Sequence, residues 1–259
     1  MKISYRVFWL PKRGSSTEEY EDAFAPGNSD GIAEERKNEI ESKNFKCAVA
    51  DGATETSFSG LWAKLLCKSY IDGELQISDI EQLSGLQQKW LAEVSGQQLP
   101  WYAEEKLASG AFATIAGLTL SEEKKQCSWS VTALGDSCFF QIREQQLIAA
   151  SPLSKWEDFN YNPALLSTRQ SSNEGILDGQ RNENGQCQKG DLIYLMTDAI
   201  SKWFLHRLSL HNDAISILEG VDDKDAFAAF VDEARNDKDA DGHPMMPNDD
   251  VTWIRISLS

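Results

Sequence analysis

The sequence predicts an α+β fold in which a central antiparallel β-sandwich is flanked by α-helices. Three observations lead to this fold class. Apolar residues recur in a strand pattern at both ends of the chain, over residues 3–10 and 251–258. Short strand patterns separated by turn residues fill residues 111–149, as in an antiparallel meander. Helical patterns stand in blocks between these strands, which favours α+β over alternating βαβ units.

The first fifty residues predict three strands. Residues 3–10 alternate up to Pro11, and a second short strand is expected over residues 20–24. Residues 25–44 are polar and contain glycine, which is typical of a loop or a solvated hairpin tip. Residues 45–50 carry apolar side chains on both faces, as expected for a strand inside a sandwich.

The later elements follow the same reasoning. From Phe58 onward, apolar residues recur at i, i+3 and i+4 and predict a helix, followed by a second helical region over residues 79–108. Residues 151–189 are rich in Ser, Asn, Gln and Gly, so they are expected to be mostly irregular. The remaining predictions are strands at 111–120, 128–134, 138–143, 146–149, 192–196 and 251–258, and helices at 199–208 and 225–234.

Composition limits the class of protein. The 259 residues are 41% hydrophobic and show no internal repeat or break in composition, so we expect a single domain over residues 1–259. A net charge of −16 argues against nucleic acid as a partner and disfavours anionic membrane surfaces. No window approaches the roughly 20 apolar residues of a membrane span, and the N-terminus lacks signal-peptide features. We therefore expect a cytoplasmic protein.

The cysteines are odd in number and scattered, without a CxxC pair. This pattern predicts reduced thiols in a reducing compartment and no structural zinc site. The five positions are Cys47, Cys67, Cys127, Cys138 and Cys187.

Acidic residues stand where predicted strands begin or end. Each one alone is better explained as a turn or helix-cap residue, because Asp is common there. Strands of one sandwich end at shared rims, however, and converging carboxylates would repel one another unless a cation lay between them. Oxygen ligands suit Mg²⁺ or Mn²⁺, and two such ions would activate a bridging water. The residues concerned are Asp22, Asp51, Asp136, Asp198, Asp249 and Asp250.

Six motifs in order resemble the metal-dependent protein phosphatases of the 2C type, which remove phosphate from phosphoserine and phosphothreonine. They are YEDAF, VADGATE, SGAFATIAGLTL, ALGDSCFFQI, GDLIYLMTDAI and NDDVTWIRI. The resemblance covers nearly the whole chain and is greatest to a bacterial branch whose first metal loop reads like DGATES. It implies a central antiparallel β-sandwich flanked by helices, in agreement with the periodicity.

The resemblance also implies roles for individual residues. Asp51 would bridge two Mg²⁺ or Mn²⁺ ions, the Gly52 carbonyl would bind one of them, and Asp198 and Asp249 would hold the other. Asp51, Asp198 and Asp249 would thereby carry catalysis, by in-line attack of a metal-activated water without a phosphoenzyme. Further metal contacts are implied for Glu21 and Asp22 through waters, and for Asp136 with Asp198 at a third ion.

The chain departs from the family pattern in the residues that handle phosphate. Ala53 replaces a His, Thr17 replaces an Arg, and Asp250 replaces an Asn, which adds a negative charge near the ions. Phosphate docking must therefore use another cation, of which Lys12 and Arg13 are the nearest in sequence, or be weak. Asp198 is followed by Ala where the family usually has Gly, a change that keeps the ligand.

Three functional readings follow. The first is a cytoplasmic Mg²⁺/Mn²⁺-dependent phosphatase acting on a phosphorylated protein, with a serine/threonine kinase as its counterpart. The second is a catalytically weak module that resembles a pseudophosphatase and binds a phosphoprotein or protein partner. The third is an acidic scaffold whose aspartates serve turns. His243, in the loop before Asp249, is better explained as a turn residue than as a further ligand.

Overall fold

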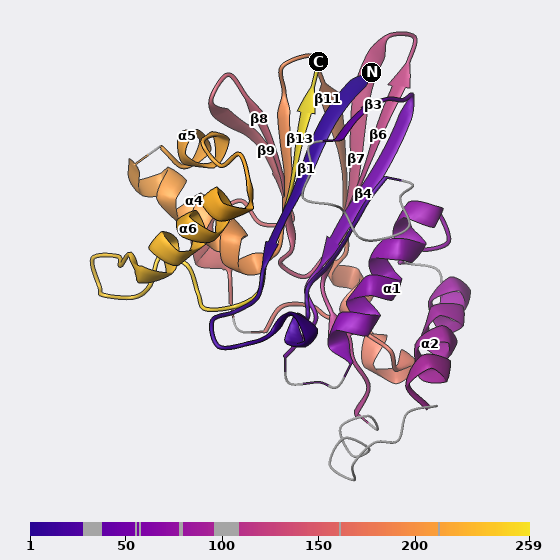
Figure 1. Cartoon of the computed structure of the whole chain (residues 1–259). Coiled ribbons are helices and arrows are strands. Elements are labelled where there is room, and N and C mark those ends of the chain that lie inside the picture. Colours follow the sequence, from indigo (N-terminus) through magenta and orange to yellow (C-terminus); the bar gives the residue numbers. More distant parts are fainter. Residues whose placement is uncertain are drawn as a thin grey trace.

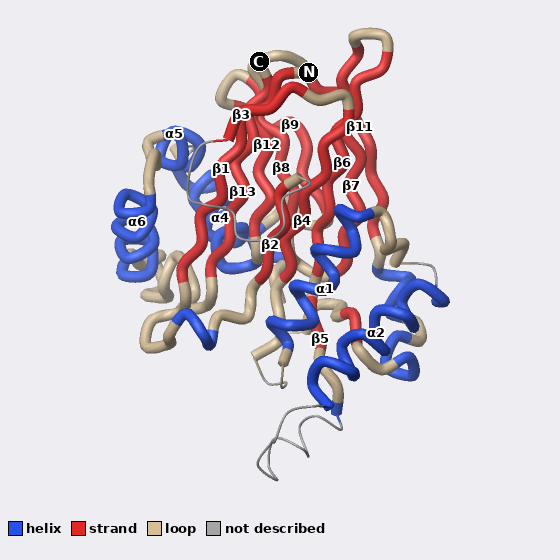
Figure 2. Tube along the Cα trace, turned by 45° about the vertical axis from the view of Figure 1, so that its right-hand side comes forward, coloured by secondary structure: helices blue, strands red, loops and turns tan. Residues whose placement is uncertain are grey.

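Two antiparallel sheets pack face to face, and helices lie on both outer faces (Figures 1 and 2). The predicted fold class is confirmed. The computed structural model describes residues 1–27, 38–54, 56, 58–77, 80–95, 109–160, 162–211 and 213–259. Within these residues, no helix has the length and apolar character needed to cross a membrane.

The first sheet has its N-terminal and C-terminal strands side by side in its interior. β1 pairs with β13 from Ile3 opposite Leu258 to Leu10 opposite Val251. In spatial order the strands are β3 (Asn38–Glu41), β1 (Lys2–Leu10), β13 (Val251–Leu258), β12 (Leu192–Met196), β8 (Cys138–Arg143) and β9 (Gln146–Ser151).

The second sheet is built mainly from the middle of the chain. Its strands are, in spatial order, β11 (Arg181–Cys187), β7 (Gln126–Leu134), β6 (Ile115–Glu123), β4 (Asn44–Ala50) and β2 (Ala23–Pro26). A separate two-stranded ladder joins β5 (Phe112–Ala113) to β10 (Leu166–Ser167).

Side chains alternate between the two faces of a strand, so each buried strand places one row of apolar side chains between the sheets. Val7, Val49, Leu118 and Ile254 all lie in this inner core. The opposite faces pack against helices, so β4, β6 and β12 are buried on both sides, as their continuous apolar sequences predict.

Helices cover the two outer faces. α1 (Ser59–Asp72) packs on the second sheet with α2 (Ile80–Ser95) beside it, and Trp62 of α1 is fully buried. The first sheet is covered by α4 (Asp198–His211), α5 (Ala214–Glu219) and α6 (Lys224–Asn236). Short 3₁₀ helices are η1 (Thr17–Glu19), η2 (Trp156–Asp158), η3 (Gln170–Asn173) and η4 (Ile176–Gly179).

Several element predictions need correction. Residues 20–22 are not in a strand, because β2 begins at Ala23. Residues 25–44 contain β3, and residues 151–189 contain β10 and β11. β11 was missed because it is an edge strand with mostly exposed polar side chains, so it shows no apolar alternation. Residues 28–37, within the predicted loop, and 96–108, within the second predicted helical region, lie outside the described residues.

The prediction of five reduced thiols is wrong for one pair. Cys127 and Cys187 form a disulfide, with their Cα atoms 5.2 Å apart. They stand directly opposite each other where β7 pairs with β11, so the bond links an edge strand to its neighbour. Only the register of two strands 60 residues apart reveals this pairing. Cys47, Cys67 and Cys138 are buried free thiols.

Candidate metal centre

The structure brings the predicted ligands to one end of the sandwich. At this end Ala23 lies opposite Ala50, and Met196 lies opposite both Cys138 and Trp253. The start of β2 and the end of β4 therefore share a rim, as do the start of β8, the end of β12 and the start of β13. Accordingly, Glu21 and Asp22 precede β2, Asp51 and Gly52 follow β4, Asp136 lies between β7 and β8, Asp198 begins α4, and Asp249 precedes β13.

Backbone and hydroxyl groups fix the Asp51 loop. The Asp51 N–H donates to Oγ1 of Thr114 at 3.2 Å, and the Asp51 carbonyl accepts from the Thr114 N–H at 2.8 Å. The Thr114 hydroxyl also bonds the Ser137 hydroxyl, 2.7 Å away. Because Ser137 follows Asp136, this network sets the Asp51 loop relative to the Asp136 turn.

Gly52 is required at its position by close packing. A Cβ atom there would lie 2.7 Å from the Ser59 carbonyl carbon and 2.8 Å from the Glu21 carbonyl oxygen. Backbone atoms cannot move aside as a flexible side chain does, so only glycine lets the Asp51 loop, the start of α1 and the Glu21 segment meet.

Asp22 is the most buried acid of this centre, with 1% of its surface exposed. Its Oδ2 accepts from the hydroxyls of Thr197 at 2.8 Å and Thr252 at 2.7 Å. Burial and repulsion from Asp250 and Asp249 raise the pKa of Asp22 to about 8, although the two threonine bonds oppose the shift. The carboxyl thus joins the ends of β12 and β13.

Three partly exposed carboxylates surround the same centre. Burial raises the pKa of Asp51 well above its ordinary value, and repulsion from Asp198, Asp22, Asp136 and Asp249 raises it further. The pKa of Asp198 is raised well above its ordinary value by burial and by Asp136, Asp249 and Asp22, and that of Asp249 is also raised by burial. These carboxylates are close enough to repel one another.

Asp136 tests whether the centre fits a metal ion. Its Oδ1 is buried and has no hydrogen-bond partner among the residues that the structure describes, and burial raises its pKa to about 6. A buried carboxylate oxygen without a hydrogen-bond donor is suited to contact a cation. The other possible ligand atoms of the centre are carboxylate oxygens, which match a hard divalent cation such as Mg²⁺ or Mn²⁺. The residues present therefore fit the metal implied by the fold.

The structure distinguishes the two candidate phosphate-docking cations. The Lys12 ammonium lies 3.1 Å from Oε2 of Glu21 and 3.2 Å from the Thr54 hydroxyl, beside the acids. Arg13 instead reaches α6, where its guanidinium bonds Asp232 and Asn236. A cavity of about 490 Å³ opens beside Lys12, and its lining includes Lys12, Glu21, Thr54, Phe58, Leu61 and Lys64.

Asp250, which stands where the family has Asn, acts on the backbone. Its Oδ1 accepts from the Lys12 N–H at 2.8 Å, and its Oδ2 accepts from the Glu21 N–H at 2.7 Å. Glu21 in turn accepts from the Ser59 hydroxyl at 2.8 Å. Asp250 therefore holds Lys12 and Glu21 beside each other, a role that its place in the sequence did not reveal.

Sequence reasoning missed the hydroxyls that support the acids. Thr197 and Thr252 bond Asp22, and Thr114 bonds the backbone of Asp51. The available signal was a Thr immediately before Asp198 and another two residues after Asp250. Each of these threonines is a polar residue at the end of a strand that is mainly apolar.

His243 does not join this centre. Its side chain is 77% exposed, and its Nδ1 lies 3.7 Å from Oδ2 of Asp239. Ligand-type atoms of Asp239, Asp241 and His243 lie within 4.8 Å of one another. The bonds that Asp239 accepts from the Asp241 and His243 N–H groups explain this arrangement as a turn.

Solved structures share the fold over nearly their whole length. The photosystem II phosphatase PBCP matches at 15% identity and a TM-score of 0.55 over 99% of both chains. The serine/threonine phosphatase PstP/Ppp of Mycobacterium tuberculosis matches at 12% identity and 0.53 over 100% of both chains. RsbX in complex with magnesium matches at 18% identity and 0.50, over 100% of this chain and 96% of that one.

The chain has the fold of the 2C-type protein phosphatases. Neither a protein-family model nor a curated protein sequence matches it, so the likeness is one of structure. The resemblance that the six motifs predicted is confirmed at this level.

Proposed function

We propose that this chain is a Mg²⁺- or Mn²⁺-dependent phosphatase that hydrolyses phosphoserine and phosphothreonine in proteins. The observation that carries the proposal is the group of carboxylates at one end of the sandwich, whose pKa values are raised by burial and by one another. A divalent cation would remove that repulsion. The likeness to structures described as serine/threonine phosphatases supports the substrate class.

The residues that would hold metal are those of the carboxylate group. Asp51 would lie between two ions, the Gly52 carbonyl would serve one, and Asp198 and Asp249 would serve the other. Glu21 and Asp22 would act through waters, and Asp136 would complete a third position with Asp198. The magnesium bound to RsbX supports a divalent ion here. When bound, such ions lower the pKa of a water and neutralise charge on the phosphoryl oxygens.

Lys12 is the residue that we propose for phosphate docking. Its ammonium has three donors, and the structure gives it two partners, Glu21 and Thr54. Asp250 fixes the Lys12 backbone, so the ammonium is held next to the centre before substrate arrives. A lysine offers a point charge rather than the two-pronged contact of an arginine, which favours weaker docking than in relatives with Arg.

The chain offers no acid at the position of the usual loop His. Ala53 has no ionisable group, and its N–H is bonded to the Phe112 carbonyl. We therefore propose that the leaving serine or threonine oxygen takes its proton from solvent. This arrangement favours good leaving groups over poor ones.

The alternative is a phosphoprotein-binding module without turnover. Thr17 and Ala53 favour it, because both replace residues that handle phosphate in the family. In either case the partner is a phosphorylated protein, with a serine/threonine kinase as counterpart. A cytoplasmic location also remains a prediction.

The test measures hydrolysis of p-nitrophenyl phosphate and of phosphoserine and phosphothreonine peptides with Mn²⁺ or Mg²⁺. Asp51→Asn and Asp198→Asn should each lower kcat by about 10²-fold or more, while the exposed Asp232→Asn should have no effect. Lys12→Met should mainly raise KM. If no ion supports turnover of any of these substrates, the proposal that the chain is an enzyme is refuted. If calorimetry also shows no Mn²⁺ binding, the proposed metal centre is refuted as well.

A further inference from the structure

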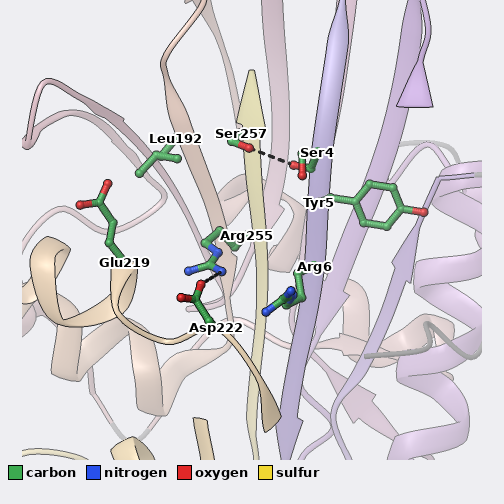
Figure 3. Close-up of a pocket in the computed structure, with 8 residues that line it drawn as sticks. All are labelled: Ser4, Tyr5, Arg6, Leu192, Glu219, Asp222, Arg255 and Ser257. Carbon is green, nitrogen blue, oxygen red and sulfur yellow. Dashed lines mark hydrogen bonds and ion pairs between the residues drawn. The ribbon is translucent and has the colours of Figure 1, made fainter. Parts of the chain in front are cut away.

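A second cavity, of about 270 Å³, lies on the outer face of the first sheet, near the segment that follows α5 (Figure 3). Its floor holds Arg6 of β1 and Arg255 of β13, which are directly opposite in register. Ser4 and Ser257, two positions away on the same face, line it further along. β1 reaches the metal centre only at its other end, after Leu10, so this cavity is a separate place.

The two guanidinium groups repel each other, and Arg255 has hydrogen-bonding and ion-pair partners. Its Nη1 donates to the Leu218 carbonyl at 3.1 Å, and its Nη2 lies 3.5 Å from Oδ1 of Asp222. Burial lowers the pKa of Arg255, and the charge of Arg6 lowers it further. Like charges directly opposite on paired strands destabilise a sheet unless something compensates them.

For Arg6 the compensation is weaker: its guanidinium carbon lies 5.8 Å from the centroid of the Phe8 ring. Its Nε and Nη1 are buried and have no hydrogen-bond partner within the described part of the chain. The hydroxyl of Tyr194, the next residue in the same cross-strand row, is also buried without a partner there. The nearby acid Glu219 accepts from Gln145 at 2.6 Å. Buried donors of this kind carry a free-energy penalty that an acceptor would remove.

We propose that this cavity binds a small oxyanion, a phosphate or carboxylate group, on the guanidinium groups of Arg6 and Arg255. Arginine forks match the geometry of both groups. The volume is below the roughly 300–1,000 Å³ of drug-sized sites, which favours an inorganic anion or a small metabolite over a nucleotide or peptide. The anion supplies the acceptors that Arg6 lacks and offsets the repulsion between the two arginines. This inference does not depend on the proposed phosphatase activity.

The experiment uses the full chain in EDTA, so that phosphate cannot bind through metal. Inorganic phosphate and acetate are titrated separately, and binding is followed by calorimetry and by the rise in Tm. Wild type should bind one or both, and the preference between them identifies the oxyanion. Arg6→Gln should raise Kd about tenfold or more, because a charged hydrogen-bonding partner is lost. Lys12→Gln, at the metal centre, should leave Kd unchanged.

Three results would overturn the inference: no binding of either anion to wild type, equal binding by Arg6→Gln, or loss of binding in Lys12→Gln. Circular dichroism and the Tm without anion show whether Arg6→Gln is folded. If it is not, Arg6→Lys replaces it. That variant keeps the charge but not the fork, so it should weaken binding while retaining the fold, and unchanged Kd in it would equally count against the site.

Discussion

Asp250→Asn restores the residue that the family carries, yet we expect it to destabilise this chain. Asp250 is 2% exposed, and each of its oxygens accepts one backbone N–H, from Lys12 at 2.8 Å and from Glu21 at 2.7 Å. Asparagine has a single acceptor oxygen, and its NH₂ group would face the other N–H. One bond to a charged acceptor is lost and one buried donor is left unsatisfied, so the free energy of unfolding should fall by about 2–4 kcal/mol.

Urea unfolding in EDTA at neutral pH measures this loss without interference from metal. The matched control is Asp232→Asn, since Asp232 is 64% exposed and pairs with Arg13 on the surface. We expect the control to change the free energy of unfolding by less than about 1 kcal/mol. An Asp250→Asn midpoint equal to that of wild type, with an unchanged m-value, would refute the role assigned to the two backbone bonds.

Three further predictions concern stability. Without metal, the free energy of unfolding should contain a component that declines as pH rises from about 4 to about 8, because the pKa of Asp22 is raised from 3.8 to about 8, so over this range the unfolded chain loses the proton that the folded state keeps. Asp22→Asn should make the decline in urea titrations across pH shallower, since the other raised carboxyls still contribute, and a slope equal to that of wild type would contradict the assignment. Arg143→Gln should cost about 3 kcal/mol or more at neutral pH, because it leaves the fully buried Asp191 without its cation. Burial alone would raise the pKa of Asp191, but its hydrogen bonds, with that from Arg143 the largest, lower the pKa overall. The stabilisation by the Arg143–Asp191 pair is therefore present above the ordinary pKa of Asp and is lost as pH falls. A destabilisation by Arg143→Gln that is unchanged at acidic pH would count against this explanation. Reduction of the Cys127–Cys187 bond should lower the free energy of unfolding by about 2–4 kcal/mol, whereas the double Cys→Ser variant should not respond to reductant.

Much of the fold follows from local periodicity. β1, β4, β12 and β13 were predicted within one or two residues, because buried strands show their apolar rows directly in the sequence. β11 was not, since an edge strand with polar side chains depends on backbone pairing to β7, which leaves no apolar signature. The register of β7 and β11 also determines that Cys127 and Cys187 lie close enough to form the disulfide.

In the candidate site, too, some residues could be predicted from local sequence and others depend on distant contacts. Acids at strand ends were visible because Asp is rare inside strands, and their order along the chain matched the family motifs. The choice between Lys12 and Arg13 was not visible, because adjacent residues after a strand diverge to opposite neighbours. The function of Asp250 was also hidden, since it acts on the backbone of residues that lie 229 and 238 positions away.

The central place of β13 has a consequence for biosynthesis. β13 inserts between β1 and β12, so during translation both of those strands keep an unpaired edge until β13 emerges. Open edges on apolar strands invite pairing with other chains. A ribosome-bound nascent chain, or a product that stops short of Val251, would therefore hold two exposed apolar edges although it already contains every acid of the centre. Such intermediates are natural clients for a chaperone that shields strands.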